Sequence, residues 1–110
     1  YHGHAHRALS LSPGAVLDLL QRIDAFRQPE VFEEFLLAVT ADARGRPGFE
    51  DKPYPQAAWL KRAHQAVQSR SLTEITASGI KGEALRRAIR EARVQAVAKA
   101  RIAFDDLPSE

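Results

Sequence analysis

Apolar side chains recur at helical intervals in the first part of the chain. Between residues 11 and 26, five of them lie three or four positions apart on one helical face: Val16, Leu19, Leu20, Ile23 and Phe26. Ser12 followed by Pro13 is a typical start for this helix, because serine caps free helix N–H groups and proline suits the first helical position. Pro29 separates it from a second helix over residues 30–43, whose expected inward residues are Val31, Phe32, Phe35, Leu36 and Val39.

The spacing predicts a third helix that begins at Pro55 and ends near Ser69. Its core face carries Trp59, Leu60, Ala63, Ala66 and Val67. Trp59, the single tryptophan, is interpreted as a core anchor. His64 has no obvious partner at helical spacing, so we interpret it as a surface residue without a role.

The last third of the chain predicts one short helix and one long one. The run from Ser71 to Glu74 reads as a capping box, and the short helix that it opens ends at Gly79. A long helix follows from Glu83 to about Phe104, with an expected buried stripe of Leu85, Ile89, Ala92, Ala96 and Ala103. We therefore predict an all-α bundle of about four to six helices.

The central segment, Ala41–Gln56, interrupts the helical pattern. It holds three prolines and two glycines, which exclude a long regular element. Phe49 and Tyr54 can bury apolar area, and Asp42 is expected to form a salt bridge with Arg44 or Arg46. We predict one long ordered loop packed by its own side chains. It is either a structural connection or a functional loop, and its arginines either bind RNA or staple the loop.

Composition narrows the class of protein. The chain has 110 residues, 45% of them hydrophobic, which suffices for one small domain or part of a larger one. No apolar run exceeds five residues, so no membrane span is expected. The lack of cysteine excludes disulfides and thiolate sites and fits a cytoplasmic protein. The chain also lacks methionine, even at position 1, so we expect it to be processed, trimmed or a fragment.

Charge is distributed unevenly although the net charge is only +2. Residues 28–51 carry six acids and two bases, whereas residues 79–101 carry seven bases and two acids. In the last helix, four arginines line a face other than the apolar stripe: Arg86, Arg90, Arg93 and Arg101. Such a face is either solvated or contacts RNA phosphates. The Lys81-Gly82 turn would add backbone N–H donors for a phosphate.

Three of the four histidines lie at the start of the chain, at positions 2, 4 and 6. On a helix, His2 and His6 share a face and can chelate a divalent metal. The alternative is an exposed start, or a segment whose natural partners are missing.

The central segment also carries a resemblance to a known family. Asp42, Arg44, Gly45, Arg46, Gly48, Phe49 and Glu50, followed by Tyr54, Pro55 and Gln56, are similar to the C-terminal region of bacterial CCA-adding tRNA nucleotidyltransferases with an HD phosphohydrolase domain. The match covers nearly the whole chain. The resemblance implies that residues 1–11 are the trailing end of the HD domain. It implies that residues 12–110 are a helical tRNA-binding C-terminal domain.

The same resemblance implies a function for the parent protein. Such enzymes add C, C and A to the tRNA 3′ end from CTP and ATP with magnesium, and their HD site holds nickel or another transition metal. His2 matches the metal-binding histidine of that site. No catalytic residue of the transferase is expected in this chain, which we expect to be inactive alone. The expected RNA-binding residues are Arg44, Arg46, Lys81, Arg86, Arg90 and Arg93. The alternative is a structural or dimerisation module, in which the alanine-rich stripe of the last helix forms a homodimer.

Overall fold

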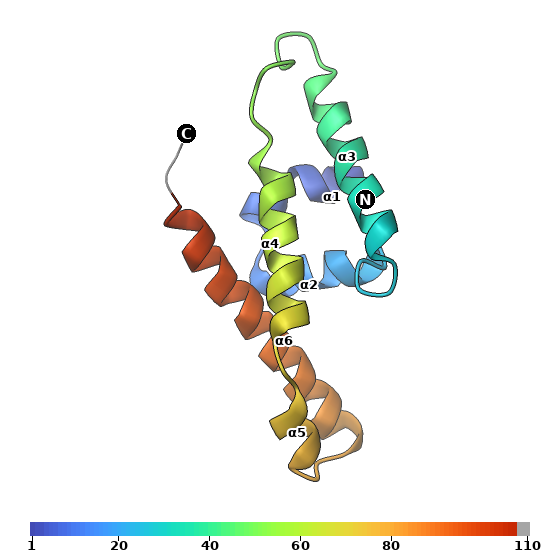
Figure 1. Cartoon of the computed structure of the whole chain (residues 1–110), viewed down its shortest axis with the longest axis vertical. Helices are drawn as coiled ribbons and strands as arrows, with labels where there is room; N and C mark the ends of the chain where they lie inside the picture. Colours follow the sequence, from blue (N-terminus) through green and yellow to red (C-terminus); the bar gives the residue numbers. More distant parts are fainter. Residues whose placement is uncertain (108–110) are drawn as a thin grey trace.

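The computed structural model describes residues 1–107, which form six α-helices and one short 3-10 helix, η1 (Figure 1). In chain order these elements are α1 (His2–His6), η1 (Ala8–Ser10), α2 (Pro13–Arg22), α3 (Pro29–Arg44), α4 (Pro55–Ser69), α5 (Thr73–Ala77) and α6 (Gly82–Asp105). The described residues contain no β-strand. The predicted all-α fold is therefore confirmed.

The core lies where α2, α4 and α6 meet, and α3 and α1 close it from the other side (Figure 1). Helix α6 crosses α4 and α2, while α3 runs beside α4 in the opposite direction. Ala5 of α1 and Ala8 of η1 are fully buried in this same core. The division of the chain after residue 11 stays a prediction, but both parts share one packed interior.

Prolines set the starts of the helices as predicted. Pro13, Pro29 and Pro55 each occupy the first position of a helix, and the Ser12 hydroxyl accepts a hydrogen bond of 3.2 Å from the backbone N–H of Ala15. The end of α2 differs from the prediction. The helix stops at Arg22 because the chain turns at Asp24, which has a φ of 59°. Ile23 and Phe26 nevertheless pack against the core from that turn.

The predicted faces of three helices, α2, α3 and α6, also differ from the observed ones. Val31 is 44% exposed rather than inward-facing, and Ala103 is exposed, whereas Leu17 and Val97 are fully buried outside the predicted stripes. Leu17 and Val97 are buried because α2 packs against both α4 and α6, and α6 packs against α2, α4 and α5. A helix covered on two sides buries a wider arc than a single stripe.

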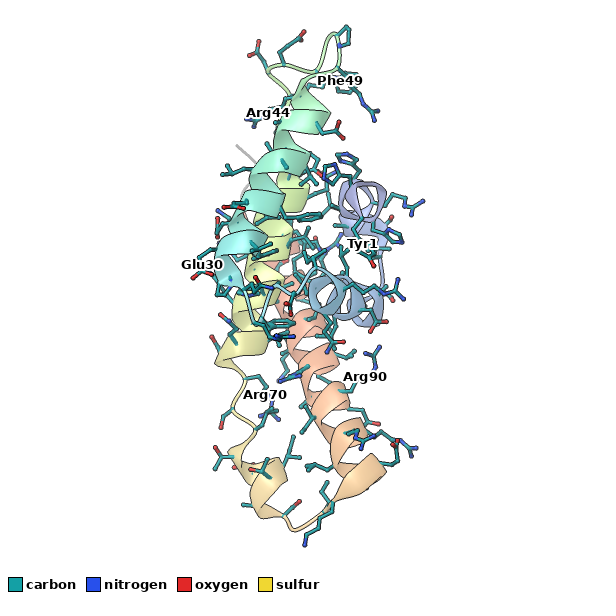
Figure 2. The ribbon with its side chains drawn as sticks, turned by 90° about the vertical axis from the view of Figure 1, so that its right-hand side faces the viewer. Tyr1, Glu30, Arg44, Phe49, Arg70 and Arg90 are labelled. Carbon is teal, nitrogen blue, oxygen red and sulfur yellow. The ribbon has the colours of Figure 1, made fainter. Side chains whose placement is uncertain are left out.

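One end of the molecule extends beyond the core. We call α5, the following turn and the first two turns of α6 the α5–α6 arm, residues 73–89 (Figures 1 and 2). None of its described residues is fully buried. The arm forms one end of the molecule's longest axis, which measures 55 Å against 20 Å for the shortest. Gly79 and Gly82 flank the turn with φ values of +87° and +62°, which other residues adopt only at a cost.

Candidate functional site

His6 joins three segments that are far apart in the sequence. It lies in the last turn of α1 with its Nδ1 2.8 Å from the Tyr54 hydroxyl and its Nε2 2.8 Å from Asp42 Oδ2. Asp42 belongs to the last turns of α3, and Tyr54 directly precedes α4. In the tautomer whose Nε2–H donates to the carboxylate, Nδ1 accepts a hydrogen bond from the Tyr54 hydroxyl. The Gln56 amide also donates to the His6 carbonyl at 3.0 Å, so this end of α1 is fixed from both sides.

The prediction that Asp42 pairs with Arg44 or Arg46 was wrong. Its carboxylate bonds to His6 instead, because α1 packs alongside α3 and brings the imidazole within reach. The hydrogen bond from His6 lowers the pKa of Asp42 below its ordinary value, against a smaller opposing effect of desolvation. Burial raises the pKa of Tyr54, and the nearby Asp42 charge acts in the same direction. At neutral pH, Tyr54 is therefore a protonated donor beside an ionised Asp42.

The α3–α4 loop, residues 45–54, is ordered by short-range contacts, as predicted. The Arg44 Nε donates to the Lys52 carbonyl at 3.2 Å, which ties the two ends of the loop together. The Lys52 ammonium lies 4.8 Å from the centre of the Phe49 ring, a cation–π contact. Phe49 is less buried than expected, with 45% of its surface exposed. At least one loop arginine, Arg44, thus acts as a staple.

A pocket of about 310 Å³ lies between this loop, the adjoining ends of α3 and α4, and His6. Three of its lining residues are cations, Arg44, Arg46 and Lys52, and none of the aspartates or glutamates among residues 1–107 lines it. The remaining walls are mainly apolar and aromatic: Ala43, Phe49, Pro53, Tyr54 and Pro55, with His6 and Gln56 as polar groups. The site therefore suits an anion that also carries a flat apolar part.

The arginine face of α6 serves partly as a packing surface. Arg90 Nη1 lies 2.7 Å from Asp18 Oδ1 of α2. Arg101 donates to the Leu9 carbonyl at 2.8 Å and lies 5.4 Å from the centre of the Trp59 ring. These contacts use the same face as buried Val97, which points at the core.

Within the arm, the predicted RNA-binding residues Lys81 and Arg86 are exposed. Among the residues that the structure describes, Arg86 forms an ion pair with Glu83 alone, one turn earlier, at 2.8 Å, and both side chains are more than three-quarters exposed. Lys81 is exposed at the start of α6. Arg93 is half-buried. Arg44 ends α3 and Arg46 lies in the α3–α4 loop, at the opposite end of the molecule, as the label of Arg44 in Figure 2 shows. The predicted residues therefore form two separate groups rather than one surface.

Comparison with known proteins agrees with the predicted resemblance. A protein from Thioalkalivibrio sulfidiphilus named Multifunctional CCA protein is 50% identical over 97 residues, which are 88% of this chain. Proteins of the same name from Nitrosococcus oceani and Pseudomonas aeruginosa are 46% and 48% identical over 100 and 97 residues. The chain is homologous to part of the multifunctional CCA proteins. It spans about a quarter of the length of these relatives, covering 24–25% of each. No family model and no solved structure matches the chain.

The histidine that the resemblance to CCA enzymes assigns to a metal site is His2. Its ring packs edge-on against Phe35 at 5.7 Å between centres, while both ring nitrogens of His6 are already hydrogen-bonded. Within residues 1–107, no three His, Cys, Asp or Glu side chains are grouped closely enough to hold a metal ion. The role of His2 as a metal ligand stays a prediction. In the same residues, no helix has the length and apolar character needed to cross a membrane.

His64 was interpreted wrongly as a surface residue. It is only 7% exposed and lies between two aromatic rings, 5.2 Å from Phe26 and 4.7 Å from Phe32. Its Nε2 lies 2.9 Å from the Ala25 carbonyl and donates to it. The sequence held a signal for this position, because His64 is four residues after Leu60 and three before Val67.

Proposed function

We propose that the chain is the C-terminal helical part of an enzyme that adds CCA to the 3′ end of tRNA, and that it contributes contacts to the tRNA backbone. The proposal is supported by the similarity to multifunctional CCA proteins across about nine-tenths of the chain. In this proposal, CTP, ATP and magnesium act at parts of the enzyme outside these residues, and the protein is cytoplasmic. α1 with His2 would complete an HD domain whose transition metal has its other ligands elsewhere.

The observation that carries the tRNA contact is the exposed basic surface of the α5–α6 arm. Lys81 and Arg86 lie there in solvent, and the weak surface pair with Glu83 leaves the Arg86 guanidinium available to a phosphate. The first turn of α6 adds backbone N–H groups at its positive end. Because the arm extends beyond the core, an RNA backbone can reach it without displacing packed residues.

The other proposed RNA contacts rank below the arm. Arg90 would have to share its guanidinium with Asp18, and Arg93 is half-buried, so we assign them smaller contributions than Arg86. Arg44 and Arg46 would contact RNA at the other end of the molecule. The alternative, a dimerisation module, relied on the alanine-rich stripe of α6. That stripe is largely used within the molecule, because Ala92 is buried and Ala96 is half-buried where α6 packs on α4.

Binding of fluorescently labelled tRNA at low and high salt tests this proposal. The variant Lys81→Glu/Arg86→Glu should weaken binding and lower the slope of log affinity against log salt by about one for each phosphate that is no longer neutralised. The matched control, Arg22→Glu/Arg62→Glu, changes the charge equally at two exposed arginines outside the arm. Equal weakening in both variants would reduce the effect to net charge, and no binding at low salt would refute the tRNA contact.

A further inference from the structure

The pocket beside the α3–α4 loop combines groups that the proposed backbone contact does not explain. Backbone phosphates need exposed cations only, whereas this pocket also presents two aromatic rings and a concave floor. We infer that it binds one nucleotide, with the phosphate held by Arg44, Arg46 and Lys52 and the base placed against Phe49 and Tyr54. This inference rests on the proposed function, which already assigns RNA contacts to Arg44 and Arg46, and it names the ligand that they would bind.

The cations support a phosphate ligand. The bond from Arg44 Nε to the Lys52 carbonyl brings these two residues to the same side of the loop, and it leaves both Nη groups of Arg44 for other partners. Among residues 1–107, none of the three pocket cations lies within 4.0 Å of a carboxylate, unlike Arg90 and Arg101. Clustered like charges favour an anion of more than one charge, and guanidinium groups match phosphate oxygens with paired hydrogen bonds. A phosphate monoester meets both conditions better than a single carboxylate.

The aromatic residues support a base. Phe49 is 45% exposed although it is a large apolar side chain in an otherwise ordered loop. Lys52 already covers part of its ring by the cation–π contact, and Tyr54 is held in place by its hydrogen bond to His6. Stacking of a base on an aromatic ring accepts any base and needs no further hydrogen bonds.

The size of the pocket limits the ligand. A volume of about 310 Å³ lies at the lower end of the roughly 300–1,000 Å³ that is typical for small-molecule sites. It suits one nucleotide and excludes a base-paired stretch. The nucleotide is either free or the unpaired end of an RNA strand, since both present the same phosphate and base.

Titration of the 110-residue chain with AMP, followed by NMR, tests the inference. The amide signals of Gly48, Phe49 and Tyr54 should shift, and adenosine and inorganic phosphate should each bind at least about tenfold more weakly than AMP, because each lacks one half of the ligand. Arg46→Ala and Lys52→Ala should each weaken AMP binding by about tenfold. The controls Arg62→Ala and Lys99→Ala remove exposed cations outside the pocket and should leave affinity within about twofold of the parent chain.

Three results would overturn the inference: no shift of the loop signals with AMP, equal binding of adenosine or of phosphate alone, or AMP binding that the pocket variants do not weaken.

A short single-stranded RNA ending in A identifies the source of the ligand. Tighter binding of that RNA than of AMP through the same residues assigns the pocket to an RNA end, and the reverse assigns it to a free nucleotide. The arm variant Lys81→Glu/Arg86→Glu should leave AMP binding unchanged. Loss of tRNA binding in that variant and loss of AMP binding in the pocket variants are therefore separate outcomes.

Discussion

Replacement of His64 by alanine should destabilise the fold strongly, because this side chain has both an apolar and a polar role in the core. Truncation leaves a cavity between Phe26 and Phe32, and large-to-small core changes of this kind cost about 2–5 kcal/mol. It also removes the donor to the carbonyl of Ala25, a residue with 0% exposure, and an unpaired buried carbonyl costs about 1–3 kcal/mol. Because the two terms overlap, we expect a total loss of about 3–5 kcal/mol.

That loss is large beside the total stability of a domain of this size, about 5–15 kcal/mol. Urea unfolding followed by fluorescence measures it directly, since the single tryptophan, Trp59, is 1% exposed and reports on the core. With an m-value of about 1–3 kcal/mol/M, the midpoint should fall by at least about 1 M.

Two further variants separate the polar role of His64 from the apolar one. His64→Leu fills the space without a donor, and His64→Gln restores an N–H group, so both should be more stable than His64→Ala. The control is His4→Ala, because His4 is exposed and its ring lies 6.0 Å from the centre of the Tyr1 ring, outside the core. A loss below about 1 kcal/mol in His64→Ala, with an unchanged m-value, would refute the buried role of this histidine.

Two other predictions concern ion pairs. The folded state lowers the pKa of Asp42 below its ordinary value of 3.8, so the unfolded chain binds more protons in the acid range. The ionised Asp42 therefore stabilises the fold fully above pH 3.8, and this stabilisation is lost as the pH falls through the folded-state pKa. Asp42→Asn should therefore reduce stability more at pH 6 than near pH 3 in urea unfolding, and an equal difference at both pH values would contradict the bond to His6. A double-mutant cycle with Arg90→Ala and Asp18→Ala should give a coupling of about 0.2–1 kcal/mol, since both side chains are half-exposed. A coupling near zero would show that the pair does not hold α6 to α2, and would leave Arg90 free for RNA.

The helices from α2 onward were predictable from the sequence because their signals are local, whereas α1 and η1 were not predicted. Pro29 and Pro55 begin α3 and α4 as the sequence predicted. The ring of proline fixes its φ angle near the helical value, and its missing N–H costs nothing at the first position, where that group would have no partner in the helix. The end of α2 was not predictable from the apolar pattern. Phe26 keeps its place in the core from a turn, so the pattern continues after the helix has ended.

The contacts of the candidate site depend on tertiary packing instead. The bond between His6 and Asp42 joins residues 36 positions apart, and no local spacing distinguishes His6 from His2 and His4 as the partner. The arginines of α6 share one face, but the sequence does not show that this face packs against the core, with Asp18 of α2 opposite Arg90 and buried Val97 between the arginines. Composition and motif therefore predicted the central loop and the last helix, whereas the partner of each charged side chain could be identified only from the folded structure.

Helix α6 also has a mechanical consequence. Its 24 residues form one continuous rod, about 36 Å long at 1.5 Å per residue, with neither glycine nor proline after Gly82. Arg86 lies in solvent near its start, and Val97, eleven residues further along, is buried in the core. Helix α6 has no internal proline or glycine at which to kink, so we expect a ligand that displaces the arm to shift Phe104 and Arg101, which pack against Trp59. The fluorescence of Trp59 should therefore change when the arm binds a ligand, even though this tryptophan does not lie in the arm.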